Sequence, residues 1–413
     1  MRSRRLRRPA RLILPLCAIG AAIASAQCGL LGAPGEYAGS GTSGDVPDGG
    51  SDGTVTTDGT TTSDGNVVLP DGNVIPGSIG TIAILAGERD PTSADDNPAW
   101  TGDAWSGIVG PDGRIASWRI DQSATFIGSF ETAVVTDGRW FAINTGFGIA
   151  GGRAATIQSA LWGPGVGGDW KGARVNPPGG LDEHTKAFFG SHVLFVGGTR
   201  TFAVDGGTNT FFTREVHAAD VDVTASTLGG TANSGIELAL ARARPAVLVE
   251  GTHAYVIGGR SSGGITATVE RTTLDIPAGG LGAFSNQPSM TSGGADHRVY
   301  APSAAAGEGF VFVAGGRTNT AGAPSAVVLS AKIGATGDLE AWNTLTPLPA
   351  ELRDFGFVVF KKRLYVIGGR DAAGARTRDV LSASIAADGT IGAWDAANAK
   401  LPAARSDIVT AAY

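Results

Sequence analysis

The sequence predicts an all-β fold made of six similar, four-stranded antiparallel sheets. Two observations lead to this prediction. A run of apolar strand-forming residues that ends in a small, usually double-glycine step occurs six times, and a second motif follows it along the chain. The small steps begin at positions 86, 144, 197, 258, 315 and 368. Repeats of this length, carried by short strands, are typical of β-propellers, in which each repeat forms one blade.

The first motif is clearest in three copies, which read LYVIGGR, AYVIGGR and VFVAGGR at residues 364–370, 254–260 and 311–317. Less regular copies read VLFVGG, IAILAG and WFAINT at residues 193–198, 82–87 and 140–145. Glycine allows a strand to end in close contact with a neighbouring backbone, so we interpret the double glycines as structural. They do not form a phosphate loop, since no Gly-Lys-Ser/Thr follows them.

The second motif reads Gly, any residue, Ile or Leu, any residue, Ala or Ser, and an aromatic residue. It occurs at residues 113–118, 279–284, 337–342 and 389–394. The distance between the two motifs leaves room for one more strand and two turns, so each repeat is predicted to form a four-stranded sheet. The tryptophans on this grid are expected to pack between sheets, as large aromatic side chains do in cores; they are Trp118, Trp170, Trp342 and Trp394.

Four hydrophobic residues, Gly-Gly and a tryptophan some 25 residues later resemble the kelch repeat, and the six copies cover residues 80–413. The chain lacks the tyrosine that kelch repeats usually carry between the glycines and the tryptophan. The resemblance implies a six-bladed propeller. Residues 401–413 resemble the segment 348–355 that leads into the sixth strand motif, whereas the first repeat lacks such a segment. We therefore predict that the strand at 407–413 is innermost in the blade begun by Ile82 and closes the ring.

The N-terminal residues 1–26 are predicted to be a signal peptide. Six arginines precede an apolar run at 12–26, which is too short for a membrane span. Residues 25–28 read SAQC and resemble a bacterial lipobox, in which Cys28 would carry a lipid anchor. The alternative is ordinary cleavage after Ala26. The only other cysteine is Cys17, inside the apolar run, so the folded domain has no disulfide to make.

Residues 27–79 are predicted to be a disordered linker, and residues 80–413 the propeller. The linker is rich in Gly, Ser, Thr and Asp and holds too few large apolar residues to bury a core. Removal of the signal peptide takes away six positive charges and shifts the net charge from −6 to about −12. Such an acidic chain argues against nucleic acid as a partner, and it leaves the lipid anchor as the one predicted contact with a membrane.

Charged side chains recur where each innermost strand is predicted to begin. In kelch propellers this position lies near one mouth of the central channel, so the resemblance implies a charged ring there. Arginines in such a ring would hold a carboxylate with two hydrogen bonds. The alternative is that these residues only pair with one another. The candidate ligand-binding residues are Glu131, Asp182, His184, Arg242, Arg244, His297, Arg298, Arg353, Asp354, Arg405 and Asp407, with Glu183 and Asp296 beside them.

Catalytic residues are not predicted. Copper oxidases with kelch repeats require a tyrosine cross-linked to a cysteine, and no cysteine follows Cys28 in this chain. The Ser-x-Asp-x-Gly-x-Thr-Trp motif of sialidase propellers is absent. The five histidines show no metal-ligand spacing. We predict no metal and no cofactor.

The sequence thus favours a monomeric, non-catalytic binding or scaffold module of the bacterial periplasm or cell surface, with a protein or acidic glycan ligand. The alternative is a periplasmic carbohydrate-modifying enzyme, similar to a mutarotase or epimerase, that uses the same ring.

Overall fold

The computed structural model describes most of the chain as antiparallel β-structure. The described residues are 67–68, 74–75, 78–89, 100–121, 128–136, 139–148, 156–161, 171–174, 181–204, 207–222, 225 and 227–412. None of them belongs to a helix that is long and apolar enough to cross a membrane. The predicted signal peptide, Cys28 and most of the predicted linker lie outside these residues. The chain is therefore all-β where it is described.

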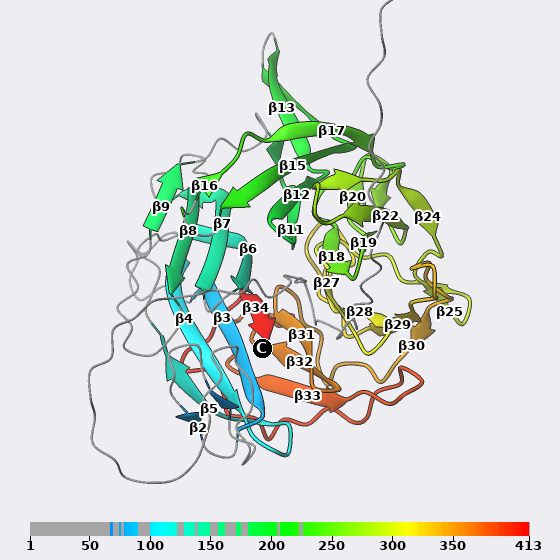
Figure 1. Ribbon diagram of the computed structural model, residues 1–413. Coiled ribbons are helices and arrows are strands. Elements are labelled where there is room, and N and C mark those ends of the chain that lie inside the picture. Colours follow the sequence, from blue (N-terminus) through cyan, green and yellow to red (C-terminus); the bar gives the residue numbers. More distant parts are fainter. Residues whose placement is uncertain are drawn as a thin grey trace, which may run out of the picture.

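The larger sheets follow one another along the chain and surround a common centre (Figure 1), so the arrangement is propeller-like. We name each sheet after the strand that carries the first sequence motif. The β3 sheet has the order β34-β3-β4-β5, from Val409–Ala412, Gly80–Glu88, Trp100–Val109 and Ile115–Ile120. The β7 sheet has the order β6-β7-β8-β9, from Gly128–Thr136, Arg139–Gly148, Thr156–Leu161 and Lys171–Arg174.

The next two sheets branch at their outer edge. The β12 sheet joins β11, β12, β15 and β16, with β17 also on β15; these are Thr185–Phe189, His192–Val196, Glu215–Asp222, Thr227–Leu228 and Ala232–Glu237. The β19 sheet joins β18, β19, β22 and β23, with β24 also on β22; these are Ala246–Glu250, His253–Ile257, Val269–Asp275, Gly280–Leu281 and Ser285–Gln287.

The last two sheets differ in their outer strand. The β28 sheet has four strands, β27 to β30, from Ser303–Gly307, Phe310–Ala314, Val328–Lys332 and Asn343–Thr344. The β32 sheet has three, β31 to β33, from Gly356–Phe360, Arg363–Ile367 and Val380–Ser384. Its expected fourth strand is reduced to two isolated bridges, which join Ser382 to Asp395 and Ile385 to Ile391. The described sheets therefore do not all have the four strands that the sequence predicted.

Small ladders complete the described strands. They are β1-β2 (Val67–Val68, Val74–Ile75), β10-β13-β14 (Leu181–Asp182, Thr199–Val204, Gly207–Phe212), β20-β21 (Arg260–Ser261, Gly264–Ile265) and β25-β26 (Thr291–Ser292, Ala295–Asp296). The β13-β14 hairpin is an insertion after the double glycine of the third repeat, and it projects from the ring of sheets in Figure 1.

The hydrophobic core lies between neighbouring sheets. The apolar run of the strand motif supplies it, because all four of its side chains are buried in β12, β19, β28 and β32. Tyr255 and Ile257 of β19, for example, pack with Val311 and Val313 of β28. Burying each such side chain stabilises the fold by about 1.5–3 kcal/mol before chain entropy is subtracted.

The second sequence motif connects several of the described sheets to their neighbours. Gly337 has φ +80°, and a Cβ there would lie 2.5 Å from the ring of His253 in the preceding sheet, so only glycine fits. The Tyr255 hydroxyl donates a hydrogen bond to the Gly337 carbonyl at 2.6 Å. The indole N–H of Trp342 donates to the Pro288 carbonyl at 2.8 Å, again across the sheet boundary. Trp118 and Trp394 make the same kind of bond.

The C-terminal strand belongs to the first sheet. β34 pairs antiparallel with β3, from Ile82 opposite Ala412 to Leu85 opposite Val409. It also lies beside β6 and β31, the innermost strands of the two adjacent sheets. The C-terminus accordingly lies near the centre of Figure 1. The C-terminal segment thus supplies the first strand of the β3 sheet.

Candidate functional site

The residue two positions before an innermost strand is left-handed in five sheets. We call these the entry residues: Glu183, Arg244, Ala301, Asp354 and Asp407, with φ between 46° and 57°. A left-handed residue other than glycine costs about 1–2 kcal/mol, so surrounding contacts must hold it. The Arg244 N–H donates to the Glu183 carbonyl at 2.9 Å, and the Ala301 N–H donates to the Arg244 carbonyl at 2.9 Å. The Asp407 N–H donates to the Asp354 carbonyl at 2.7 Å. Entry residues of adjacent sheets are thereby held together.

Each of three carboxylates near the entry residues binds two arginines. Glu183 accepts from Arg244 Nε at 3.0 Å and from Arg260 at 3.1 Å. This trio carries one positive charge in excess. The arginine side chains keep 44% and 32% of their surface exposed, so they remain accessible to a ligand.

The second and third trios repeat this chemistry. Asp354 accepts from Arg317 at 2.6 Å and from Arg353 at 2.5 Å. Glu88, at the end of β3, pairs with Arg370 and with Arg376, the latter at 2.7 Å. The Asp354 trio again has one positive charge in excess, whereas Arg370 of the third trio also lies 4.0 Å from the Asp407 carboxylate. The arginine side chains of these two trios keep only 9% to 20% of their surface exposed, so they are less accessible to an anion than Arg244 and Arg260.

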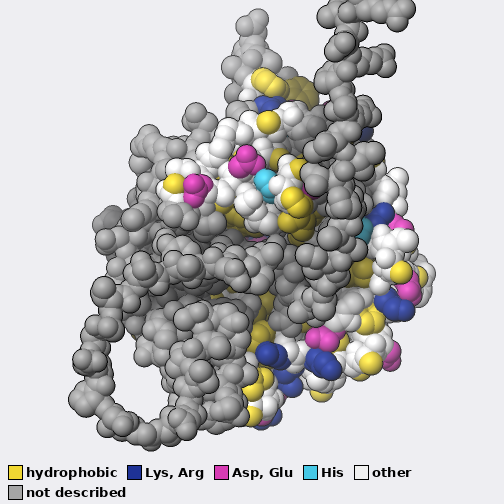
Figure 2. Space-filling view, viewed as in Figure 1, with side chains coloured by type: hydrophobic (Ala, Val, Ile, Leu, Met, Phe, Trp, Pro, Cys, Tyr) yellow, Lys and Arg dark blue, Asp and Glu magenta, His cyan; other side chains and the backbone are white. Residues whose placement is uncertain are grey.

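The trios form one continuous set of residues, which we call the arginine arc. Arg260 and Arg317 both lie over the ring of Tyr300, at 5.8 and 5.5 Å from its centroid. Arg353 and Arg370 are joined by a backbone bridge. Figure 2 shows basic and acidic side chains side by side in the lower part of the view, where Figure 1 places β31–β33. The arc therefore offers alternating charge with a positive surplus.

Asp407 is a carboxyl group in unfavourable surroundings. Burial raises its pKa to about 6, and the nearby Asp354 carboxylate acts in the same direction. Arg370, 4.0 Å away, and the Ser406 hydroxyl, which donates at 3.0 Å, offset only part of this effect. Its ionised form is thus destabilised in the folded chain.

This raised pKa predicts a pH-dependent stability. An unfolded aspartate titrates near pH 3.9, so between about pH 4 and 6 the folded state binds more protons than the unfolded state. Below about pH 4, Asp407 is protonated in both states and costs no stability. As the pH rises through 6, Asp407 ionises in the folded state as well, and the folded state loses this advantage over the unfolded state. Asp407→Asn, which tolerates the left-handed backbone, should therefore gain stability relative to wild type between pH 4 and 7. Equal pH profiles in denaturant melts would contradict this.

Several predicted residues lie in the arc. Arg244, Arg353 and Asp354 belong to trios, and Asp407 lies beside Arg370. Asp182 is half-buried at the end of β10, where its carboxylate accepts the backbone N–H of Glu183 at 3.1 Å. Glu131 is in β6, and its side chain is outside the described ones.

Three predicted residues are buried instead. Arg242 is completely buried, pairs with Glu270, and donates to the carbonyls of Gly258 and Thr268 at 2.8 and 3.0 Å. Its carbonyl accepts the N–H of Gly198 in the preceding sheet, so this position faces the sheet boundary and not solvent. A ligand in solution cannot reach this guanidinium group.

Arg405 and His184 are likewise inside the fold. Arg405 pairs with Asp103 and lies 4.8 Å from the centre of the Trp105 ring, with only 5% of its side chain exposed. The His184 ring packs against Phe195 with centroids 5.5 Å apart. Both residues stabilise sheet packing at positions where the sequence suggested ligand contact.

His297 and Arg298 lie together with Asp296 in the segment between β25 and β27, and none of the three belongs to a trio. Arg298 Nε binds Asp296 at 2.7 Å. These residues line a separate cavity, described below. The sequence placed them in the ring because their spacing from the double glycine matches that of the entry segments.

Sequence reasoning missed most of the arc's arginines. Arg260, Arg317 and Arg370 are the arginines of the strand motif itself, directly after the double glycine. Their recurrence in three of six copies was the available signal, because a purely structural motif needs no charge there. Glu88 and Arg376 do not belong to a recurring pattern of this kind, so the sequence did not indicate them.

The β13-β14 hairpin carries two exposed aromatic side chains and contacts the first trio at its base. Phe202 and Phe211 are 53% and 54% exposed, and their ring centroids are 6.2 Å apart. β13 pairs with β10, directly before Glu183, and Arg260 lies 5.5 Å from the ring centroid of Phe212 at the base of the hairpin. Because side chains alternate along a strand, Phe202 and Phe211 lie on the face of the hairpin opposite Phe212.

No protein-family model matches the chain, and no curated protein matches it. Among solved structures, one described as "Structure of YjhT" is similar to it at 14% sequence identity. The match covers 68% of this chain and 86% of that chain, with a TM-score of 0.49.

Proposed function

We propose that the chain is a kelch-type propeller of six blades, closed by β34, that binds acidic protein segments at the arginine arc without catalysis. The observation that carries the proposal is the three trios, each with two arginines for one carboxylate. Arginine holds carboxylates with paired, charge-assisted hydrogen bonds, so a segment with several carboxylates can engage more than one trio.

The exposed hairpin favours a protein ligand over a glycan. The hairpin whose base contacts Arg260 also carries the exposed Phe202 and Phe211, and aromatic and arginine side chains together are the usual anchors of protein interfaces. An acidic loop with one apolar side chain would use both surfaces. An acidic glycan would use the arginines, and it is the comparison ligand in the experiment below.

The ligand is expected to meet the protein outside the cytoplasm. Residues 1–26 would direct export, Cys28 would carry the lipid, and residues 29–79 would hold the propeller away from the membrane. Fractionation of cells that express Cys28→Ser tests the anchor, since the variant should leave the membrane fraction. A variant that stays with the membranes would contradict it.

The test of binding is a ligand-induced shift of the melting temperature of the full chain. The arc variant Arg244→Ala/Arg353→Ala removes the surplus charge of two trios, while Arg260 and Arg317 still pair with Glu183 and Asp354. A glutamate octapeptide should raise the melting temperature of wild type but not of the arc variant, and added salt should reduce the shift.

Comparison ligands sharpen this result. A trimer of galacturonate should produce a smaller shift than the octapeptide if the ligand is a protein segment, and a larger one if it is a glycan. Neutral trisaccharides should produce none. No shift of wild type with any acidic ligand, or the same shift in the arc variant, would overturn the proposal.

One observation favours the carbohydrate-modifying alternative. A general acid or base works best with a pKa near the operating pH, and Asp407, whose pKa is raised to about 6, lies beside Arg370. If this alternative holds, the full chain should accelerate anomer exchange of an acidic sugar, and Asp407→Asn should abolish the effect. Equal exchange rates with and without the protein would exclude it.

A further inference from the structure

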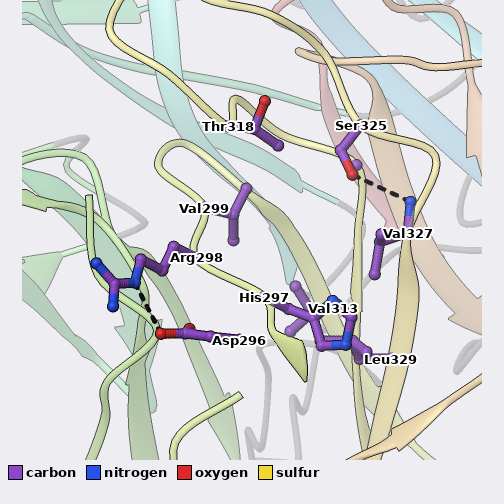
Figure 3. Close-up of a pocket in the computed structure, with 10 residues that line it drawn as sticks. Asp296, His297, Arg298, Val299, Val313, Thr318, Ser325, Val327 and Leu329 are labelled. Atoms are coloured by element: carbon purple, nitrogen blue, oxygen red, sulfur yellow. Dashed lines mark hydrogen bonds and ion pairs between the residues drawn. The ribbon is translucent and has the colours of Figure 1, made fainter. Parts of the chain in front are cut away.

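A cavity lies between the β19 and β28 sheets. Its volume is ≈ 330 Å³. Val299, Val313, Val327 and Leu329 form apolar walls, and these same residues border the hydrophobic core between the two sheets. His297, Thr318 and Ser325 add polar groups (Figure 3). The cavity is therefore an opening in the packing between two sheets, with a mostly apolar interior.

One polar atom of the lining has no partner within the protein. His297 Nε2 is buried and makes no hydrogen bond. The backbone N–H of His297 donates to the Met290 carbonyl at 2.9 Å, which fixes the segment, and Figure 3 shows the imidazole against Val313 and Leu329. A buried polar atom without a partner costs about 1–3 kcal/mol, so a bound molecule that supplied a hydrogen bond would remove this cost.

Each of the other two side-chain hydroxyls already makes one hydrogen bond, so neither oxygen is left without a partner. The Thr318 hydroxyl donates to the Ala323 carbonyl at 3.3 Å, and the Ser325 hydroxyl accepts the Val327 N–H at 3.1 Å. Figure 3 shows both at the opposite end of the cavity from His297. The position of His297 Nε2 therefore determines where the polar end of a ligand would lie.

The charges at the cavity cancel. Asp296 and Arg298 are bound to each other at 2.7 Å, and in Figure 3 the Arg298 side chain extends away from the space that the other residues surround. The pair offers no surplus charge to draw in an ion. Burying a charged ligand against valines and leucine would be costly, so the lining favours a neutral one.

The volume limits the size of that ligand. Small-molecule pockets span about 300–1,000 Å³, and a dry apolar cavity of about 150 Å³ holds a benzene ring. This cavity, at ≈ 330 Å³, has room for one ring or branched chain and a few further atoms. We propose that the inter-sheet cavity binds a small neutral molecule with an aromatic or branched apolar body and one hydroxyl or N–H group, which pairs with His297 Nε2.

The test is a ligand-observed NMR titration of the full chain with p-cresol and with toluene. The two probes share the ring and methyl group, and only p-cresol can form the hydrogen bond with His297. Wild type should bind p-cresol at least about threefold more tightly than toluene, the effect of one net hydrogen bond. Binding of neither probe, or equal affinities, would overturn the proposal.

Three variants locate the site. Val327→Phe fills the cavity and should abolish binding of both probes. His297→Leu should keep toluene binding but lose the preference for p-cresol, which also tests the proposal should Val327→Phe fail to fold. Arg114→Ala, which removes a half-exposed charge at the β3 sheet, should bind as wild type does. Unchanged p-cresol binding in both Val327→Phe and His297→Leu would place the probe elsewhere and contradict the proposal.

Discussion

A chain that ends at Arg405 is expected to lose cooperative folding at 25 °C. The truncation removes β34, and with it the antiparallel ladder from Ile82 opposite Ala412 to Leu85 opposite Val409. It also removes the buried Ile408 and the bridge between Glu88 and Ser406. The exposed edge of β3 and the freed faces of β6 and β31 then cost more than the few kcal/mol by which domains are usually stable.

Circular dichroism during thermal melting measures this loss. A chain that ends at Ala412 is the control, because it keeps every pair between β34 and β3. The control should melt like the full chain, whereas the chain that ends at Arg405 should show no cooperative transition. Equal melting of both truncations would show that β34 does not close the fold.

Glu270→Ala is expected to lower the free energy of unfolding by about 3–5 kcal/mol, the usual cost of an unpaired buried charge. Glu270 and Arg242 are both completely buried and bound to each other. Glu270 also accepts the backbone N–H groups of Ala239 at 2.6 Å and Leu240 at 3.2 Å. The substitution therefore leaves one buried cation and two N–H groups without their acceptor.

Denaturant melts of two further variants separate the effect of the unpaired buried charge from that of the lost side-chain packing. Glu270→Leu/Arg242→Met removes both charges and should recover much of the loss, since an apolar pair of similar volume often replaces a buried ion pair without cost. Glu340→Ala breaks the exposed pair with Lys332 and should change stability little. Equal changes in the free energy of unfolding in Glu270→Ala and Glu340→Ala would contradict this prediction.

The strands were largely predictable because the repeated sequence fixes both their period and their burial. Each apolar run lies in a strand, including the irregular copies in β3 and β7. The second motif predicted contact between sheets, and Trp342 and Gly337 make it. The β13-β14 hairpin was not predicted. Its only trace was the longest interval between small steps, from 197 to 258.

The site was predictable only in part, because spacing along the chain gives a position and not the direction of a side chain. Arg242 and Arg244 are two residues apart, yet one is buried and the other is 44% exposed. The left-handed backbone at Arg244 accounts for this difference in exposure, and an arginine in the sequence does not predict a left-handed backbone. His297 and Arg298 match the same spacing but line a cavity whose size depends on packing between two sheets.

The central claim is that surplus positive charge in the trios binds an acidic segment. Isothermal titration of the full chain with a glutamate octapeptide tests it most directly, with wild type, the arc variant Arg244→Ala/Arg353→Ala and the charge-matched control Arg114→Ala/Arg298→Ala. Arg114 and Arg298 are exposed and lie outside the arc. The control should bind as wild type does, and the arc variant at least about tenfold more weakly, since each charged hydrogen bond contributes about 1.5–3 kcal/mol. Equal affinities of the arc variant and the control would contradict the claim.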